Sequence, residues 1–325
     1  MTASRVPDDV LHRVVELAQR APSVHNTQPW RWRSTDGSLE LHADRSRQLA
    51  AGDPDGRNLV ISCGTVLHHV RIVADALGWK ARVSHLPDPR QPDLLARVEL
   101  SCRRPPSDAD ELLAAVDRRC TDRRRFTSWP VPDDRLTHLA ARATEWGSRA
   151  LPLTDLSEKF RAELLVNRAL DLQAADDAVR REQTAWVNHG SADGVPSNVL
   201  PGPQELTTRH ASRFMTGLLD EVVDREVEGS DGLVVICALT DDTAAWLRAG
   251  EALSAMWLDA TTDGLSLVPL SQVIEVRETR DALRFEVLGG LANPLVLVRV
   301  GWQAISRSQL PRTPRRPVDE VLELA

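Results

Sequence analysis

A four-residue sequence that occurs twice restricts the folds open to this chain of 325 residues. The segment VPDD at 6–9 recurs at 131–134, and Ser23 of the first copy falls opposite Ser148 of the second. Apolar residues at helical spacing follow both copies, so each copy predicts an amphipathic helix that begins after a proline and is capped by aspartate. Internal repetition of this kind points to one structural unit used twice.

A second pair of segments repeats in the same order. Residues 64–78 and 250–264 each begin and end with glycine, and apolar residues recur at helical period between the glycines. Each segment therefore predicts a buried helix closed by a glycine. The first pair is offset by 125 residues and the second by 186, so the second copy carries about 61 extra residues between its two helices. Two repeats in one order favour a duplication.

Strand-like runs follow each predicted helix pair. Residues 81–84 and 265–268 come after the closing glycines, and residues 95–100 and 294–300 end each unit. The predicted fold class is α+β, with two tandem copies forming a pseudo-dimer within one chain. We predict copy one over 1–110 and copy two over 111–325, joined by the polar, proline-rich linker 101–110.

The extra residues of the second copy, about 156–230, form the predicted insertion. Residues 156–183 are charged and helical in pattern, whereas 189–204 are rich in glycine and proline and have no apolar period. Long irregular loops inside a compact domain usually serve a function. Residues 189–204 are therefore the candidate for a lid.

Composition narrows the function classes. A net charge of −7 with 42% hydrophobic residues describes a globular chain that does not bind nucleic acid or a membrane surface. No signal-peptide core and no unbroken membrane-spanning run are evident, and the four cysteines lack zinc-site spacing, so a cytoplasmic protein without a metal is expected. Phosphate-loop, dinucleotide-fold, serine-hydrolase and zinc-protease motifs are absent. His68 and His69 are adjacent on a predicted helix, which favours a structural role.

Four segments are suited to a flat, phosphorylated cofactor. The first is the loop PSVHN at 22–26, which offers backbone amides and an asparagine amide. The second is RRCTDRRRF at 118–126, where Arg119, Thr121 and Arg123 alternate, so an extended strand would point all three toward a phosphate. The third is the stiff basic segment 312–317, and the fourth is the strand end and loop 264–272. Taken alone, a charged run is more often a solvated face.

At these four places the chain resembles the nitroreductase family of flavin enzymes, most of all the double-length, Acg-type NAD(P)H nitroreductases of mycobacteria. PSVHNTQPWRW resembles the family's PSxxNxQPWxF, and RRCTDRRRF resembles its RxSxR opening, with Thr121 at the serine position and one extra residue before the phenylalanine. GLSLVP and PRRPVDEV resemble its flavin-facing strand and its C-terminal arginine segment. Ser271-Gln272 departs from the family's glutamate-glycine pair.

The resemblance implies how many FMN sites the chain holds. In the family, two subunits exchange arms, and one supplies the arginine segment of a site while the other supplies the asparagine loop. Copy one has no room for an arginine segment before Val6, and copy two has Trp146-Gly147-Ser148 where the asparagine loop would stand. One composite site is then complete, which implies one FMN per chain. The implied FMN-binding residues are Pro22, Ser23, Asn26, Gln28, Arg119, Thr121, Arg123, Pro269, Leu270, Ser271, Arg315 and Arg316.

Two functions follow from the resemblance, and the sequence leaves both open. In the first, NAD(P)H reduces FMN and a nitro compound or quinone accepts the electrons, with no protein acid or base required. In the second, the chain stores or sequesters FMN without turnover because the lid closes the stacking face. A flavin-free scaffold is a third alternative. The expected partners are small molecules, and the chain is expected to be a monomer or a weak dimer.

Overall fold

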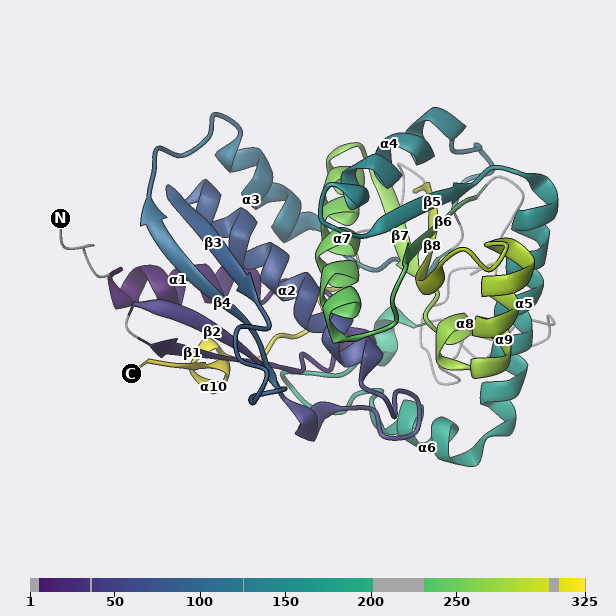
Figure 1. Ribbon diagram of the computed structural model, residues 1–325, viewed down its shortest axis with the longest axis horizontal. Helices are drawn as coiled ribbons and strands as arrows, with labels where there is room; N and C mark the ends of the chain where they lie inside the picture. The colour runs from purple at the N-terminus through teal and green to yellow at the C-terminus, as the bar shows by residue number, and fades with distance from the viewer. Residues whose placement is uncertain (1–5, 36, 125, 201–230, 304–309, 325) are drawn as a thin grey trace.

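Two mainly antiparallel sheets flank a pair of central helices (Figure 1). The structure is a computed structural model that describes residues 6–35, 37–124, 126–200, 231–303 and 310–324. The first sheet has the order β3-β4-β2-β1-β9 and the second has the order β5-β6-β8-β7. The strands are β1 (Trp30–Thr35), β2 (Ser38–Ala43), β3 (Trp79–His85), β4 (Leu94–Cys102), β5 (Arg149–Leu153), β6 (Gly232–Ala238), β7 (Leu265–Pro269), β8 (Asn293–Trp302) and β9 (Leu322–Glu323).

The two sheets have the same internal order. In each sheet an edge strand, β3 or β7, lies beside the longest strand, β4 or β8. The order β3-β4-β2-β1 of the first sheet therefore corresponds to β7-β8-β6-β5 of the second. All pairs within these two sets are antiparallel. The four strand runs expected from sequence lie inside β3, β4, β7 and β8, which confirms the mixed α+β class.

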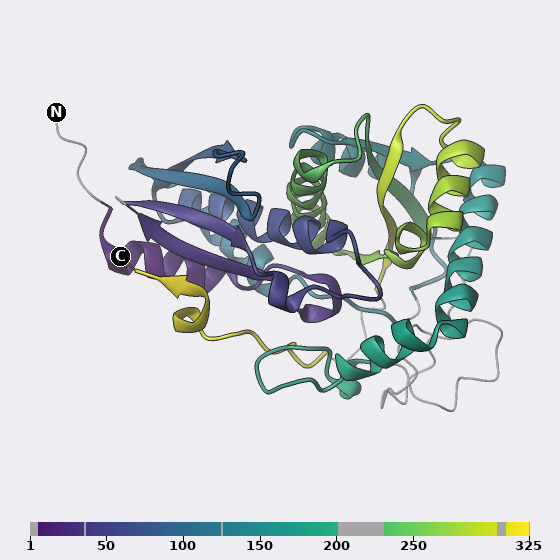
Figure 2. The ribbon, with the colours of Figure 1, turned by 60° about the horizontal axis from the view of Figure 1, so that its bottom comes forward.

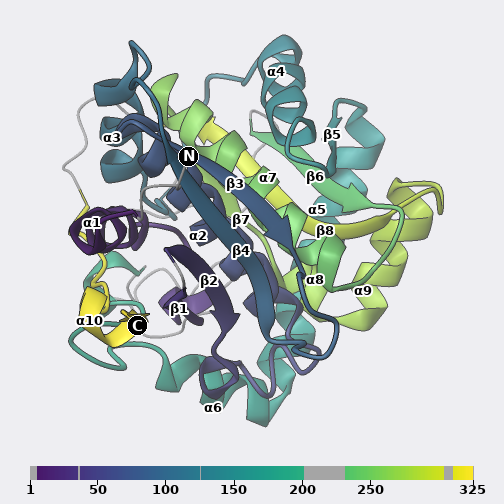
Figure 3. The same cartoon turned by 60° about the vertical axis from the view of Figure 1, so that its left-hand side comes forward.

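Ten labelled α-helices complete the described part of the chain. They are α1 (Asp8–Ala18), α2 (Arg57–Ala76), α3 (Ala109–Arg118), α4 (Asp133–Thr144), α5 (Leu156–Ala175), α6 (Asp177–Ala185), α7 (Thr243–Thr262), α8 (Gln272–Glu275), α9 (Arg277–Ala282) and α10 (Val318–Val321). Viewed from the side of the first sheet, α1 and α3 lie along one flank of its strands (Figure 3). Buried apolar side chains of α1, α2 and the first sheet form one core, and α4, α7 and the second sheet form another.

Helices α2 and α7 cross in close contact at two glycines. A Cβ added at Gly64 would lie 2.1 Å from the carbonyl oxygen of Leu247, and one added at Gly250 would lie 2.0 Å from that of Ile61. Leu247 precedes Gly250 by the same three positions as Ile61 precedes Gly64, so the contact is reciprocal. Only glycine lets two helix backbones approach this closely.

This contact corrects the expected start of both helices. The helices begin at Arg57 and Thr243, so Gly64 and Gly250 are internal crossing points and not boundaries. The closing glycines are as expected, since Gly78 and Gly264 follow the helices with φ of +83° and +78°.

The expected aspartate caps are also corrected. Helices α1 and α4 begin at Asp8 and Asp133, and the residues at their N-caps are Pro7 and Pro132, without a side-chain cap. The aspartates instead lie in the first turn, where their negative charge is favourable beside the positive end of the helix dipole.

Helix α2 is long and apolar enough to cross a membrane, contrary to the expectation that no segment would be. Its candidate window is 83% buried inside the protein, which identifies it as a core helix. His68 and His69 lie within it, and the Nδ1 atoms of both are within 2.9 Å of the Ser254 hydroxyl of α7.

The described part of the insertion, residues 156–200, contacts both halves of the molecule. The single helix expected over 156–183 is divided into α5 and α6 by Asp176, whose carboxylate accepts hydrogen bonds from the amides of Ala178 and Val179. The chain then turns back toward the first sheet, and the C-terminal segment also runs there (Figure 2). That segment adds β9 parallel to β1, with Leu322 opposite Trp32.

Candidate functional site

Loop 22–28 lies between α1 and β1 and is held in a strained shape by α2. His25, Asn26 and Gln28 have positive φ values of 47°, 55° and 48°. The Ser62 hydroxyl accepts a hydrogen bond from the amide of Val24 at 3.1 Å. Left-handed backbone at residues other than glycine is costly and gathers at functional sites.

Two further hydrogen bonds fix the loop ends. The Thr65 hydroxyl donates to the carbonyl oxygen of Pro22 at 2.5 Å, and the Ser23 hydroxyl accepts from the amide of Gln28 at 3.0 Å. Ser23 therefore closes the loop on itself, and Pro22 is the point where α2 holds it.

The C-terminal segment contacts the two amide side chains of this loop. Asn26 Oδ1 accepts from Arg315 Nη1 at 3.0 Å, and Gln28 Oε1 accepts from the backbone amide of Arg316 at 2.8 Å. Segments almost 290 residues apart in sequence are thus joined at one place.

Three arginines meet beside the loop. Arg119 and Arg315 both donate to the carbonyl oxygen of Arg20, at 3.1 Å and 3.2 Å. Arg119 is only 7% exposed and stacks over the ring of Trp257 at 4.7 Å. Its Nε and Nη1 have no hydrogen-bond partner among the described residues. A buried guanidinium with two unused donors fits an oxyanion, and a phosphate in particular.

The electrostatics of this arginine cluster (Arg20, Arg119 and Arg315) point the same way. Burial, with a smaller contribution from the charge of Arg20, lowers the pKa of Arg119 to about 10. Burial also lowers the pKa of Arg315 to about 9, with the charges of Arg119 and Arg20 adding to the effect. Asp117 lies 3.7 Å from Arg20 but pairs more closely with Arg312, at 2.6 Å. The cluster therefore carries excess positive charge.

Burial separates Arg119 from the other two residues that were expected on the same face. Arg119 is buried, whereas Thr121 and Arg123 are half-buried. Arg124 is the buried residue of the second half, and its guanidinium pairs with Asp122 at 2.7 Å. That ion pair braces the segment from within.

The two C-terminal arginines have different environments. Arg315 belongs to the cluster, whereas Arg316 donates to the carbonyl oxygens of Gln28 at 3.3 Å and Glu320 at 3.1 Å. Of the two arginines expected near a phosphate, Arg315 lies beside Arg119, and Arg316 anchors the C-terminal segment to the loop.

The strand end at 269–271 lies at the edge of the second sheet. Pro269, Leu270 and Ser271 are half-buried. The Leu270 amide donates to the carbonyl oxygen of Leu297 at 2.8 Å, and the Ser271 carbonyl accepts from the amide of Ile274 at 2.9 Å. The backbone of this segment is thus hydrogen-bonded to β8 and to α8, and its three side chains remain half-buried.

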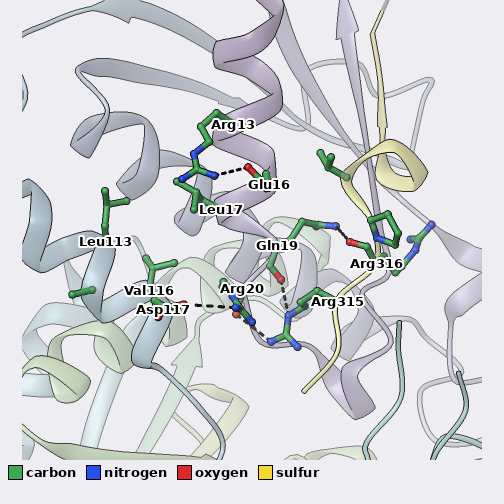
Figure 4. Close-up of a pocket in the computed structure, with 13 residues that line it drawn as sticks. Arg13, Glu16, Leu17, Gln19, Arg20, Leu113, Val116, Asp117, Arg315 and Arg316 are labelled. Atoms are coloured by element: carbon green, nitrogen blue, oxygen red, sulfur yellow. Dashed lines mark hydrogen bonds and ion pairs between the residues drawn. The ribbon is translucent and has the colours of Figure 1, made fainter. Parts of the chain in front are cut away.

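A cavity of about 660 Å³ adjoins the arginine cluster on the side of α1 and α3 (Figure 4). Arg20 and Arg315 lie together at one end of it, next to Gln19. Apolar side chains of Leu17, Leu113 and Val116 line it as well. Arg20 and Arg315 of the cluster thus line this cavity, whereas Arg119 lies buried behind them.

The insertion contacts loop 22–28 from the other side. Gln28 Nε2 donates to the carbonyl oxygen of Ala192 at 2.9 Å, and Asn26 Nδ2 donates to that of Gly194 at 2.9 Å. Asp193, between them, forms an ion pair with Arg47. Burial by itself would raise the pKa of Asp193, but hydrogen bonds from His189 and Arg47 outweigh it and lower the pKa. We call residues 187–200 the insertion loop; residues 201–204 of the expected lid lie outside the described residues.

Sequence reasoning missed Arg47, Glu182 and Asp193, the residues that attach the insertion. Glu182 of α6 accepts from the backbone amides of Ala51 and Gly52 at 3.1 Å and 2.8 Å. These contacts join residues 130 and 131 positions apart, and neither side has a recognisable motif. Apart from the glycine content of the insertion, no signal in the sequence indicated where it would attach.

Comparison with known proteins identifies the family to which the chain belongs. The family model described as "Nitroreductase family" matches residues 2–52, which include loop 22–28. The Mycobacterium tuberculosis protein named "Putative NAD(P)H nitroreductase Rv3131" is 40% identical over 321 residues, covering 98% of this chain and 92% of the relative. The chain belongs to the nitroreductase family. The M. tuberculosis protein named "Putative NAD(P)H nitroreductase acg" is 34% identical and is covered over 98% of its length.

Solved nitroreductases resemble the chain more distantly. A Bacteroides fragilis nitroreductase with bound FMN gives a TM-score of 0.40 at 15% identity, covering 62% of this chain and 94% of that one. The Mycobacterium smegmatis FMN-dependent nitroreductase NfnB in complex with NADPH gives 0.40 at 14% identity, covering 63% and 95%.

Proposed function

We propose that this nitroreductase-family chain binds one FMN and acts as an NAD(P)H-dependent oxidoreductase with a nitro compound or quinone as electron acceptor. The observation that carries the proposal is Arg119, a buried guanidinium with two donors that no described residue uses, beside Arg315 and Arg20. Membership of the family supports FMN as the group that supplies the missing phosphate. Bound FMN would supply two-electron chemistry between NAD(P)H and the acceptor.

The residues of the site have distinct parts to play. Arg119 and Arg315 would hold the phosphate, with Thr121 and Arg123 toward the ribityl chain and the N1–O2 edge. Loop 22–28 would meet the ring through Pro22, Ser23, Asn26 and Gln28. Pro269, Leu270 and Ser271 would pack near N5. A cation near the N1–O2 edge stabilises an anionic reduced flavin, so the arginines would bind the cofactor and favour its reduction.

We further propose that the chain is a fused dimer whose two halves have diverged. The matching order of the two sheets, the reciprocal crossing at Gly64 and Gly250 and the return of β9 to the first sheet support this. A fused pair already contains its partner, so a cytoplasmic monomer or weak dimer is expected, acting on small molecules.

The test of this proposal is the flavin content of the purified chain. The flavin released on denaturation is identified by chromatography, and its ratio to protein is measured after saturation and gel filtration. The expected result is FMN at one per chain. Mainly FAD, two flavins per chain or no flavin bound after saturation would each overturn the proposal.

A second function, FMN storage without turnover, is favoured by the insertion loop. This loop takes up the amide donors of Asn26 and Gln28, and the Arg47–Asp193 ion pair attaches it to the first half. A loop docked on the cofactor-binding loop would slow the access of nicotinamide, as active-site lids do. The two functions differ in how fast this loop opens.

The substitution Asp193→Ala separates the two functions. It removes the contacts to Arg47 and His189, so a lid that limits access would open and anaerobic reduction of bound FMN by NADPH would become several-fold faster. Replacing residues 189–204 by a Gly-Ser bridge should have the larger effect in the same direction. Asp177→Ala, an exposed position of α6 in the same insertion, is the matched control. Brisk and equal rates in all forms would exclude the storage function.

A further inference from the structure

A second cavity lies where the reciprocal helix crossing places the counterpart of loop 22–28. Its volume is about 540 Å³, and its lining includes His85 at the end of β3 and Gly147 after α4. His85 ends β3 as Pro269 ends β7, and the amides that follow make the same bond to the neighbouring strand. These bonds are Leu86 to Leu95 at 2.9 Å and Leu270 to Leu297 at 2.8 Å.

The helix that borders this cavity carries different side chains from its counterpart. In the first half, Ser62 and Thr65 of α2 hold the loop by hydrogen bonds. At the positions 186 residues further on, α7 carries Arg248 and Glu251, and both line the cavity. The two hydroxyl side chains that hold loop 22–28 thus correspond to two charged side chains that line the second cavity.

Glu251 organises one side of the cavity. Its carboxylate is 1% exposed and accepts from Arg71 Nη1 at 2.7 Å, with His85 Nε2 at 2.6 Å from its other oxygen. Arg71 also stacks over the ring of Trp146 at 4.2 Å. A buried carboxylate that uses both oxygens in this way fixes its cationic partner in place, and the remaining donors of Arg71 stay at the cavity wall.

Arg248 supplies a second guanidinium without a described partner. The described hydrogen bonds and ion pairs include none to its side chain, which crosses directly over Gly147. A Cβ at Gly147, where φ is +88°, would lie 2.8 Å from Arg248 Nη1. Arg248 is exposed, and the missing side chain at Gly147 leaves room for its guanidinium beside the backbone in the cavity lining. Glu145, the other acid in the lining, pairs outward with Arg142 at 2.6 Å.

We propose that this cavity is a binding site for a small oxyanion, a carboxylate or phosphate of metabolite size, held between Arg248 and Arg71. Guanidinium groups bind both oxyanions through paired N–H donors, and the volume lies within the range of small-ligand sites. In a fused dimer this place would correspond to a second cofactor site, and here it would bind a small oxyanion instead. The proposal depends on the residues that line this cavity and is independent of FMN binding at Arg119.

Isothermal titration of the full chain, saturated with FMN if it binds, tests the site with citrate and with inorganic phosphate. Sodium chloride at matched ionic strength serves as the blank. The expected result is one site per chain for at least one probe, with the tighter probe showing which oxyanion the site prefers. Arg248→Ala should weaken that binding at least tenfold, and Gly147→Ala should weaken it by displacing the guanidinium.

Two control variants make the outcome specific. Arg119→Ala, in the other half, and Arg277→Ala, an exposed arginine of α9, should leave the binding of the probe unchanged. The proposal is overturned if neither probe binds above the chloride blank. It is equally overturned if Arg248→Ala binds like the parent, or if Arg119→Ala is the variant that loses binding, because the probe would then occupy the arginine cluster.

Discussion

Loop 22–28 and the segment at 146–148 occupy corresponding places in the two halves, yet only the first is closed by a hydrogen bond of its own serine among the described residues. In the first, Ser23 closes the loop through the amide of Gln28. In the second, the hydroxyl of Ser148 is buried without a partner among the described residues, and neither asparagine nor glutamine follows it closely. The two halves therefore share one backbone arrangement at this place and differ in a few side chains.

The central helices show the same division between frame and side chains. At the crossing, α2 and α7 are interchangeable, since each places a glycine against the other's carbonyl. At the next position they differ, with Thr65 on one helix and Glu251 on the other. The close backbone contact excludes any side chain at Gly64 and Gly250, so these two positions must stay glycine. The neighbouring positions of both helices can accept other side chains.

The largest expected effect comes from breaking the shared frame. Gly64→Ala and Gly250→Ala each place a methyl group about 2 Å from a backbone carbonyl, so the helices must separate. We expect each to lower the free energy of unfolding by about 3 kcal/mol or more, at or above the upper end of overpacking costs. Urea denaturation followed by circular dichroism measures the loss.

Gly264→Ala is the control for this pair. It also changes a glycine next to the central helices, but no atom lies within 4 Å of the added Cβ, and only the positive φ opposes it. A cost of roughly 1–2 kcal/mol is expected there. A loss at only one of Gly64 and Gly250 would contradict a reciprocal crossing.

The next effect separates the two sites. Arg119→Ala removes the buried guanidinium with unused donors, and a charge-assisted hydrogen bond contributes about 1.5–3 kcal/mol, so FMN affinity should fall tenfold or more. Flavin fluorescence titration measures it, and Arg119→Lys should retain part of the affinity. Arg248→Ala, in the other half, should bind FMN like the parent. Equal losses in both arginine variants would mean that the two sites are not independent.

Much of the frame could be predicted from the sequence because it depends on local signals. Helical periodicity and the glycines at 78 and 264 located the ends of the central helices, and strand-like runs located β3, β4, β7 and β8. The start of α2 was missed because Arg57, Asn58 and Ser62 are polar and are buried only by distant partners. Arg57 pairs with Asp241, 184 residues away. Local pattern cannot show such a partner.

The candidate site was predictable in its composition but not in its geometry. The motifs indicated loop 22–28 and the arginine segment, and the structure brings Arg119 and Arg315 of these predicted residues together with Arg20. Sequence spacing favoured Arg119, Thr121 and Arg123 on one face; in the structure Arg119 is buried, Thr121 and Arg123 are half-buried, and Asp122 pairs with Arg124. The role of Arg20 was not visible because its backbone carbonyl, not its side chain, joins the other two.

The smallest expected effect concerns the two aspartates near the starts of α2 and α7. Asp53 is 4% exposed and accepts from the amides of Asn58 and Leu59, whereas Asp242, the N-cap of α7, is exposed. Burial raises the pKa of Asp53 to about 7, and the charge of Glu275 adds to the rise. Folded protein therefore keeps a proton that the unfolded chain releases near its ordinary pKa of about 4.

The stability contributed by Asp53 is then present at low pH and is lost as pH rises toward 7. One proton gives at most ~1.4 kcal/mol per pH unit, so unfolding free energy should fall across pH 5 to 7 and level off above. Asp53→Asn keeps an acceptor oxygen for one of the two amides and cannot titrate, so its curve should be flatter over that range, although its stability is lower at every pH. Asp242→Asn is the exposed control for removing a carboxylate at a helix start. Urea midpoints at half-unit steps of pH measure all three proteins, and parallel curves for Asp53→Asn and the parent would show that burial at the start of α2 does not hold that proton.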